Sequence, residues 1–193
     1  SAINLPALLS QIFMEAAGRF EDAGILNGNN TAQYDGILGS GVADYVAAAT
    51  GAITTADLTG IFYTLQSQFR QNATWVMPSL ITKQVNSIQS TAAGVTGIAS
   101  LTASPDANLL GKPVVNADDT SNNGLATALS ANNEIAVLGD FKNYMIFDRV
   151  GMSIRRNDSL YMGNDQVGFF ATRRGDGQIG LESAFKILKM AAS

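Results

Sequence analysis

The chain opens with apolar positions that recur three and four residues apart. This spacing runs from Ile3 to about Leu26 and predicts a long amphipathic helix, with Pro6 tolerated in its first turn. The run Asn27-Gly28-Asn29-Asn30 predicts the end of this helix, because Gly and Asn accept the left-handed conformation of a helix C-cap. The apolar stripe consists of Leu5, Leu8, Leu9, Ile12, Phe13, Ala16, Ala17, Phe20 and Ala23.

A second helical pattern begins at Thr54 or Thr55, after a Gly-rich loop and a short apolar stretch at 42–49. A hydroxyl at this position can cap the free N–H groups, and Asp57 suits the positive end of the helix dipole. The pattern therefore predicts a helix with one buried face. That face consists of Leu58, Ile61, Phe62, Leu65 and Phe69.

Residues 73–77 are β-branched, aromatic and apolar, which predicts a strand closed by Pro78. Ser79 can cap a third helix, which extends to about Ser90. Residues 91–104 are small and Gly-rich, which favours a loop or a hairpin.

The second half of the chain changes to strand-like patterns. Residues 110–115 predict a turn into a strand, and 116–133 form a polar connection. The tripeptide Gly175-Asp176-Gly177 supplies residues that accept positive φ, which predicts a tight hairpin. Helices early and strands late give an α+β fold class. The predicted later strands are 135–138, 144–147, 151–155, 167–172, 178–181 and, less regular, 184–190.

Composition changes this picture in one respect. The chain has 193 residues, of which 46% are hydrophobic and only 15% charged, against about 25% charged in an ordinary soluble domain. Its polar surface must therefore consist largely of uncharged side chains. A weakly charged surface suits a subunit that packs against copies of itself.

Charge is unevenly distributed along the chain. Residues 1–136 carry four basic and ten acidic side chains, whereas residues 137–193 carry eight basic and six acidic ones. This balance is too mild for a nucleic-acid-binding tract, which requires clustered Lys and Arg. It is compatible with complementary contacts between subunits.

The chain contains no Cys and no His. It therefore has no disulfide framework and no thiol chemistry, and it lacks the commonest general base and metal ligand. No apolar run is long enough to span a bilayer, and no signal peptide is visible. Ser1-Ala2 stands directly before the predicted helix, which favours a chain whose upstream part is missing.

Two short motifs suggest binding chemistry, and a structural interpretation is favoured for each. Arg174-Gly175-Asp176 spells a cell-adhesion tripeptide, but the alternating flanks favour a hairpin turn. Residues 36–41 suggest a phosphate loop, yet no strand precedes them and no Walker lysine follows. A loop after a helix is the favoured interpretation.

Asp118, Asp119 and Asn122 could ligate calcium, but they miss the spacing of a calcium loop, so a solvated turn is favoured. Arg155-Arg156 and Arg173-Arg174 would form a basic patch if their strands pair. A solvated or inter-subunit face is favoured over a nucleic-acid site for these arginines.

The best carboxylates for acid/base chemistry are the pairs Glu21/Asp22 and Asp140/Asp148. A helix points Glu21 and Asp22 about 100° apart, and Asp140 and Asp148 have no recognisable partner. The many Ser and Thr residues lack a nucleophile elbow and a His to activate them. We therefore expect no catalytic residue, no metal site and no cofactor.

Six groups of residues, taken in order, resemble the major capsid proteins of tailed bacteriophages, whose architecture is called the Hong Kong 97 fold. No single group is specific for this family, but the six occur in the family's order and spacing, and together they cover nearly the whole chain. They are RFEDAGILNG at 19–28, QYDGIL at 33–38, ITTADL at 53–58 with the helix to Phe69-Arg70 and ATWVM at 73–77, LGKPVV at 110–115, LGDF at 138–141 with Tyr144 and Asp148-Arg149, and RGDG at 174–177 through AFK at 184–186.

The resemblance implies a Hong Kong 97-like capsid fold with a long spine helix, a peripheral sheet and an axial domain. The spine helix would span 3–27. Residues 1–50 and 150–193 would form the peripheral domain, and 51–149 the axial domain. The family's N-terminal arm and extended loop precede the spine helix and are missing here, so this chain is expected to fold yet assemble poorly.

The function that the resemblance implies is a structural subunit of a phage or prophage capsid, not an enzyme. Its copies would assemble in the cytoplasm of the bacterial host, as pentamers and hexamers that enclose DNA. The assembled protein would be located in the virion capsid. Further implied partners are a portal, scaffolding and a maturation protease, with non-specific DNA contact and no membrane. The alternatives are an encapsulin-like cargo compartment shell and an unrelated α+β binding module.

Overall fold

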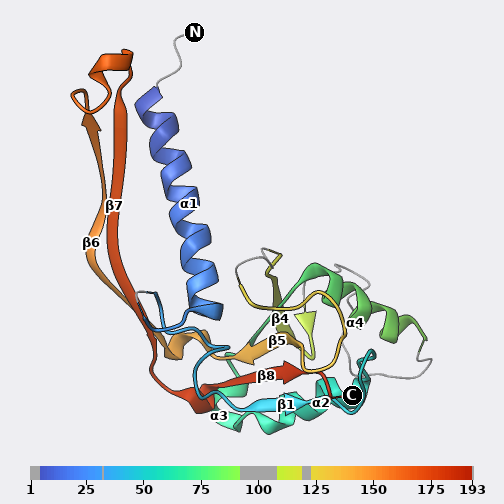
Figure 1. Ribbon diagram of the computed structural model, residues 1–193. Helices are drawn as coiled ribbons and strands as arrows, with labels where there is room; N and C mark the ends of the chain where they lie inside the picture. Colours follow the sequence, from blue (N-terminus) through green and yellow to red (C-terminus); the bar gives the residue numbers. More distant parts are fainter. Residues whose placement is uncertain (1–4, 32, 92–107, 119–122, 193) are drawn as a thin grey trace.

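The computed structural model describes residues 5–31, 33–91, 108–118 and 123–192 (Figure 1). The molecule has two parts of different shape. One, which we call the body, is a six-stranded sheet with helices packed on it. The other, which we call the stalk, is helix α1 together with the ribbon of strands β6 and β7, and it rises away from the body (Figure 1).

The first helix confirms its prediction, since α1 runs from Leu5 to Asn27. The explanation for its end is wrong in one respect. Gly28 does not have a positive φ; the left-handed residue is Asn30, with φ 56°. Gly28 is needed for space, because a Cβ there would overlap the carbonyl oxygen of Tyr34 and lie 2.5 Å from that of Gly24.

The sheet of the body has the strand order β1-β8-β5-β2-β4-β3. β1 is parallel to β8 and β2 is parallel to β4, whereas the other neighbours are antiparallel. Register places Trp75 opposite Leu138 and Val137 opposite Ile187. The strands are β1 Asp44–Val46, β2 Thr74–Met77, β3 Asn108–Leu109, β4 Lys112–Asn116, β5 Glu134–Gly139 and β8 Phe185–Lys189.

The predicted second helix is confirmed at its start and divided at its end. Thr54 caps α2, which spans Thr55–Thr64, and Asp57 completes a capping box with the backbone of Thr54. The chain then bends at Leu65 and Gln66 before the short helix α3, Ser67–Arg70. The third helix, α4, spans Ser79–Thr91.

The predicted cap of α4 differs from the observed one. The hydroxyl of Ser79 donates to Asp118 Oδ2 (2.6 Å), and its backbone N–H donates to Asp118 Oδ1 (2.7 Å). The first turn is therefore satisfied by a carboxylate 39 residues further along the chain. These two hydrogen bonds lower the pKa of Asp118 below its ordinary value.

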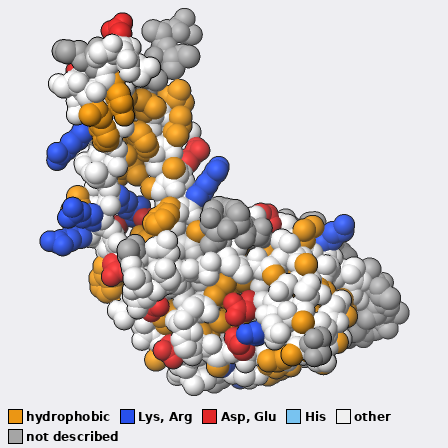
Figure 2. Space-filling model, viewed as in Figure 1, with side chains coloured by type: hydrophobic (Ala, Val, Ile, Leu, Met, Phe, Trp, Pro, Cys, Tyr) orange, Lys and Arg blue, Asp and Glu red, His pale blue; other side chains and the backbone are white. Residues whose placement is uncertain are grey.

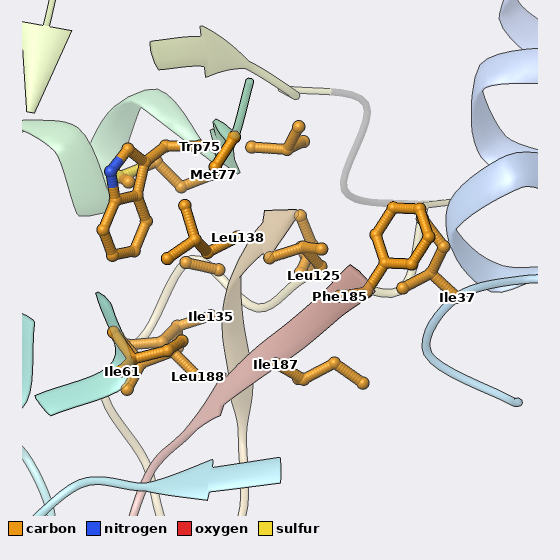
Figure 3. Close-up of a cluster of buried hydrophobic side chains, with 14 of the residues drawn as sticks. Ile37, Ile61, Trp75, Met77, Leu125, Ile135, Leu138, Phe185, Ile187 and Leu188 are labelled. Carbon is orange, nitrogen blue, oxygen red and sulfur yellow. The ribbon is translucent and has the colours of Figure 1, made fainter. Parts of the chain in front are cut away.

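The hydrophobic core lies in the body, where side chains of the sheet meet those of α2 and α4 (Figure 3). Trp75, Phe185 and Leu138 are among its fully buried members. Trp75 also satisfies its indole by donating to the carbonyl of Leu109 (3.1 Å). The connection after β4 adds Leu125, also fully buried, so this polar segment is partly a component of the core.

The ribbon contradicts one prediction. Each of its strands merges two predicted ones, because β6 is continuous over Tyr144–Asn157 and β7 over Gly168–Ile179. The predicted hairpin at Gly175-Asp176-Gly177 is wrong, since these residues pair with β6 inside β7. The connection between the strands instead contains the 3-10 turn Met162–Asn164 and Asp165, with φ 56°.

Those glycines serve a different purpose. A Cβ at Gly177 would overlap the ring of Tyr34 and lie 2.6 Å from the hydroxyl of Tyr144, and one at Gly175 would lie 3.1 Å from the hydroxyl of Tyr34. Glycine therefore lets β7 pass directly over two tyrosines. Glycine is favoured both in a tight turn and where a side chain approaches the backbone closely, so the sequence alone does not distinguish the two roles.

The predicted domain boundaries stay a prediction. The sheet joins β1 and β8, which come from the predicted peripheral part, to β5 and β2 from the predicted axial part. Strand β6 also runs across residue 150. Short 3-10 turns, Phe141–Asn143 and Glu182–Ala184, lie where the chain passes between the ribbon and the sheet.

Candidate assembly surface

The stalk exposes most of the apolar surface of the molecule. Of the 18 large hydrophobic side chains that are exposed among the described residues, 13 lie on it, and Figure 2 shows apolar side chains gathered along its length. A monomer rarely exposes so large an apolar patch, so this surface points to a contact with another molecule. The 13 are Leu8, Ile12, Met14, Phe20, Met145, Ile146, Phe147, Val150, Ile154, Leu160, Tyr161, Val167 and Phe170.

The architecture of the stalk explains this exposure. A two-stranded ribbon and one helix have too few layers to enclose a core. Of the 14 residues of β6, only Tyr144 at its base is buried. In α1, Leu26 at the end nearest the body is the one buried large hydrophobic side chain among those described.

The two faces of the ribbon differ. Arg173 contacts Glu21 of α1, so the odd-numbered residues of β7 face the helix and the even-numbered ones face away. Opposite residues of paired strands share a face, which places Arg155 beside Phe170 and Phe147 beside Asp176. We call the side that turns away from α1 the outer face. It carries Met145, Phe147, Val150, Arg155, Phe170 and Arg174.

This composition is typical of protein–protein contacts. Aromatic residues, Met and Arg are enriched in interface centres, whereas Lys is depleted. The ribbon strands carry five Arg and no Lys. Arg also binds a carboxylate through two parallel hydrogen bonds, which gives a contact a defined direction.

The predicted basic patch does not form as a single cluster, although the strands pair. The register sets Arg155 opposite Phe170 and Arg156 opposite Phe169, so neither lies beside Arg173 or Arg174. Arg156 pairs instead with Asp158 at 2.6 Å, and Arg173 is held by two carboxylates. Basic side chains on the ribbon are therefore interspersed with apolar ones.

The base of the stalk contains a charged cluster that links helix and ribbon. Arg173 of β7 forms ion pairs with Glu21 of α1 and with Asp148 of β6, the latter at 3.0 Å. Hydrogen bonding to Asp148 and the charge of Glu21 raise the pKa of Arg173. The hydroxyl of Tyr34 donates to Glu21 (3.2 Å), and burial together with this carboxylate raises the pKa of Tyr34.

A second tyrosine fixes the same region. Tyr144 at the start of β6 donates to the carbonyl of Asp35 (2.9 Å), and Asp35 in turn donates its N–H to the carbonyl of Gly177 (2.8 Å). Burial raises the pKa of Tyr144. The loop after α1 is thereby bonded to both strands of the ribbon.

Three of the four predicted carboxylates, Glu21, Asp140 and Asp148, have structural partners. Glu21 and Asp148 meet on Arg173, which the sequence does not indicate, since the three residues belong to three different elements. Asp140 is buried and accepts from the N–H of Lys142 (3.2 Å), so it caps the turn before β6.

The calcium and phosphate candidates are also placed. Asp118 caps α4, whereas Asp119 and Asn122 lie outside the described residues. Residues 36–41 form a turn after α1, as predicted. In the described part of the chain, no group of three or more acidic side chains could hold a metal ion. None of the described helices is long and apolar enough to cross a membrane.

A hollow of about 500 Å³ lies between the end of α1 and strands β2 and β4. Arg19 and Asp22 border it on the helix side, and Val76, Val115 and Asp118 on the side of the body.

Comparison with known proteins identifies the architecture. The sequence model described as "Phage capsid family" matches residues 1–190. No curated protein sequence matches the chain. Among solved structures, the chain is similar to the capsid of a native GTA (gene-transfer agent) particle, with a TM-score of 0.78 and 23% identity, over 100% of this chain and 67% of that one.

Two further structures share the fold at lower identity. The chain from Gordonia phage Cozz has a TM-score of 0.58 and 17% identity, over 98% of this chain and 65% of that one. The SrpI encapsulin complex from Synechococcus elongatus PCC 7942 has a TM-score of 0.64 and 13% identity, over 93% of this chain and 63% of that one. The predicted α+β shell-protein fold is confirmed.

Proposed function

The chain belongs to the phage capsid family, and from this premise we propose that its copies meet through the stalk and close into rings of five and six. Membership confirms the predicted role as a structural capsid subunit that is not an enzyme. Assembly into shells with copies of itself is a property of this fold family. The ring sizes and the contact surface are the parts that we propose.

The observation that carries the proposal is the outer face of the ribbon. A subunit that folds a well-packed body yet exposes many large apolar side chains on the stalk gains stability when a neighbour covers them. Arg155 and Arg174 give the contact direction, because they can pair with carboxylates of the adjacent copy. The part of the chain before residue 137, with its excess of acidic side chains, supplies the complementary charge.

The two observed parts suggest how the subunit is used. We propose that the stalk acts as the peripheral domain and the body as the axial domain, whose loops meet at the ring centres. This assignment moves β1 and β8 from the predicted peripheral part to the axial one, because they pair within the sheet of the body. Family membership alone supports the further proposed partners, which are a portal, scaffolding, a maturation protease and enclosed DNA.

The test is the mass of the purified chain in solution, measured by light scattering across a concentration series. We expect weak association, in which the mass rises above that of the monomer toward that of rings only at high concentration. The double variant Phe147→Ser/Phe170→Ser, which removes both aromatic side chains of the outer face, should remain monomeric over the same range. A wild-type chain that stays monomeric, or a variant that associates equally well, would contradict the proposal.

A further inference from the structure

The direction of the ribbon relative to α1 depends on very few polar contacts. Among the described residues, the pair between Arg173 and Glu21 is the one ion pair that joins the helix to the ribbon. The same guanidinium holds Asp148 on the neighbouring strand. Arg173 thus joins three elements, α1, β6 and β7, at a single point.

The surroundings of Arg173 strengthen its contact with Glu21 and fix the distance between the helix and the ribbon. The Arg173 side chain is 28% exposed and that of Glu21 21%, so both are largely withdrawn from water, which strengthens their attraction relative to a fully exposed pair. Tyr34 packs against Gly24 on one side and Gly177 on the other, and its hydroxyl adds a hydrogen bond to Glu21. The ring of Tyr34 works as a spacer that fixes how closely the helix and the ribbon approach.

The rest of the stalk offers little resistance to bending. The ribbon is only two strands wide, and beyond Tyr144 no residue of β6 is buried. Strand β6 also carries two register shifts, one between Asp148 and Val150 and one between Val150 and Ser153. Such irregularities bend a strand and change its twist. Both lie just beyond the point where Arg173 holds Asp148.

We infer that Arg173, together with Glu21, Asp148 and the Tyr34 spacer, is a positioning cluster that sets the angle of the ribbon and hence the direction in which its outer face meets a neighbour. This inference rests on the proposed function of that face. In a closed shell, the direction of each contact determines curvature, because a heterologous contact closes into a ring only when its rotation divides a full turn. Loss of the cluster should therefore alter the geometry of assembly without unfolding the body.

The experiment measures the ribbon angle in the isolated chain. The chain has no cysteine, so Ser159→Cys at the ribbon connection and Ser130→Cys on the body can each carry one spin label. Double electron–electron resonance then gives the distribution of distances between ribbon and body. The measurement is made at a concentration where the chain is monomeric, so it does not depend on assembly.

Arg173→Gln should widen this distribution roughly twofold, since a released contact allows rigid-body motion. Arg174→Gln is the matched control, because it removes the same charge from the next residue on the opposite face and should leave the distribution unchanged. Arg173→Lys keeps the charge but cannot hold two carboxylates as a planar fork, and it should give an intermediate width. Unfolding followed by the single Trp75 should be similar in all three variants.

A distribution for Arg173→Gln as narrow as that of the wild type would overturn the inference, and so would equal widening by Arg174→Gln. Failure of the proposed function has a different signature, namely a wild-type chain that never associates in light scattering. If association occurs, Arg173→Gln should give a wider range of particle sizes than the wild type.

Discussion

The body and the stalk of this subunit solve the problem of stability in different ways. In the body, β5 and β8 have neighbours on both sides, and neither strand has an exposed residue. In the stalk, β6 and β7 have only each other, and most of their large side chains remain exposed. The described part of the body encloses a core of its own, whereas the stalk leaves most of its large apolar side chains exposed.

This difference shows which substitutions affect folding and which affect assembly. A side chain removed from the body leaves a cavity or an unsatisfied group in every state of the chain. A side chain removed from the outer face of the ribbon alters little until a neighbour arrives. The two regions can therefore be separated experimentally by comparing matched substitutions.

The largest expected effect is in the core of the body. Phe185→Ala removes a fully buried ring that packs edge-to-face on Phe141 at 5.4 Å, and it should lower the free energy of unfolding by about 3–5 kcal/mol. Phe170→Ala, on the exposed ribbon, should cost less than about 1 kcal/mol in the monomer. Denaturant unfolding followed by Trp75 fluorescence checks both, and equal costs would break the distinction between the two parts.

The next effect compares two glycines of the same helix. Gly18 has open space around it, so Gly18→Ala should raise the free energy of unfolding by up to about 1 kcal/mol through helix propensity. A Cβ at Gly24 would lie 2.8 Å from the Tyr34 ring, so Gly24→Ala should lower it by about 1–2 kcal/mol. Thermal unfolding of the two variants measures this difference. Melting temperatures that shift in the same direction would show that Tyr34 is not tightly packed against Gly24.

The smallest effect concerns the cap of α4 and depends on pH. The pKa of Asp118 is lowered in the folded chain, so its carboxylate contributes stability above its ordinary pKa of 3.8 and loses that contribution as pH falls through the folded value. Because this carboxylate is exposed, Asp118→Asn should cost less than about 1 kcal/mol at neutral pH.

The difference between wild type and Asp118→Asn should shrink as the solution is acidified, which melting temperatures across pH can measure. In a Ser79→Ala background, which lacks one of the two donors, the substitution should have a smaller effect. A difference that stays constant with pH would show that the two hydrogen bonds do not stabilise the ionised carboxylate.

Sequence periodicity predicted the local elements well where one face is buried. The stripe of α2, the capping role of Thr54 and the strands around Trp75 and Leu138 all follow from positions close together in the chain. Local patterns could also identify the exposed ribbon strands, but only as fragments, because bulges interrupt their alternation.

What the sequence could not show are contacts between distant residues. Glycines 175 and 177 have the composition of a turn, and only the position of Tyr34, some 140 residues earlier, explains why they stand in a strand. The partners of Arg173 and Ser79 are likewise remote in sequence. The sequence also did not predict the outer face of the ribbon as a candidate surface. Alternating apolar residues in β6 and β7 are typical of half-buried strands, but the outer face has no described layer packed on it.

Amide hydrogen exchange tests the central claim most directly, because it reports on both parts of the molecule in one experiment. In the dilute chain, the amides of β6 and β7 should exchange much faster than those of β5 and β8. When the chain self-associates, exchange in the ribbon should slow, while exchange in the body stays the same. A ribbon as protected as the body in the dilute chain, or unchanged on association, would contradict the account.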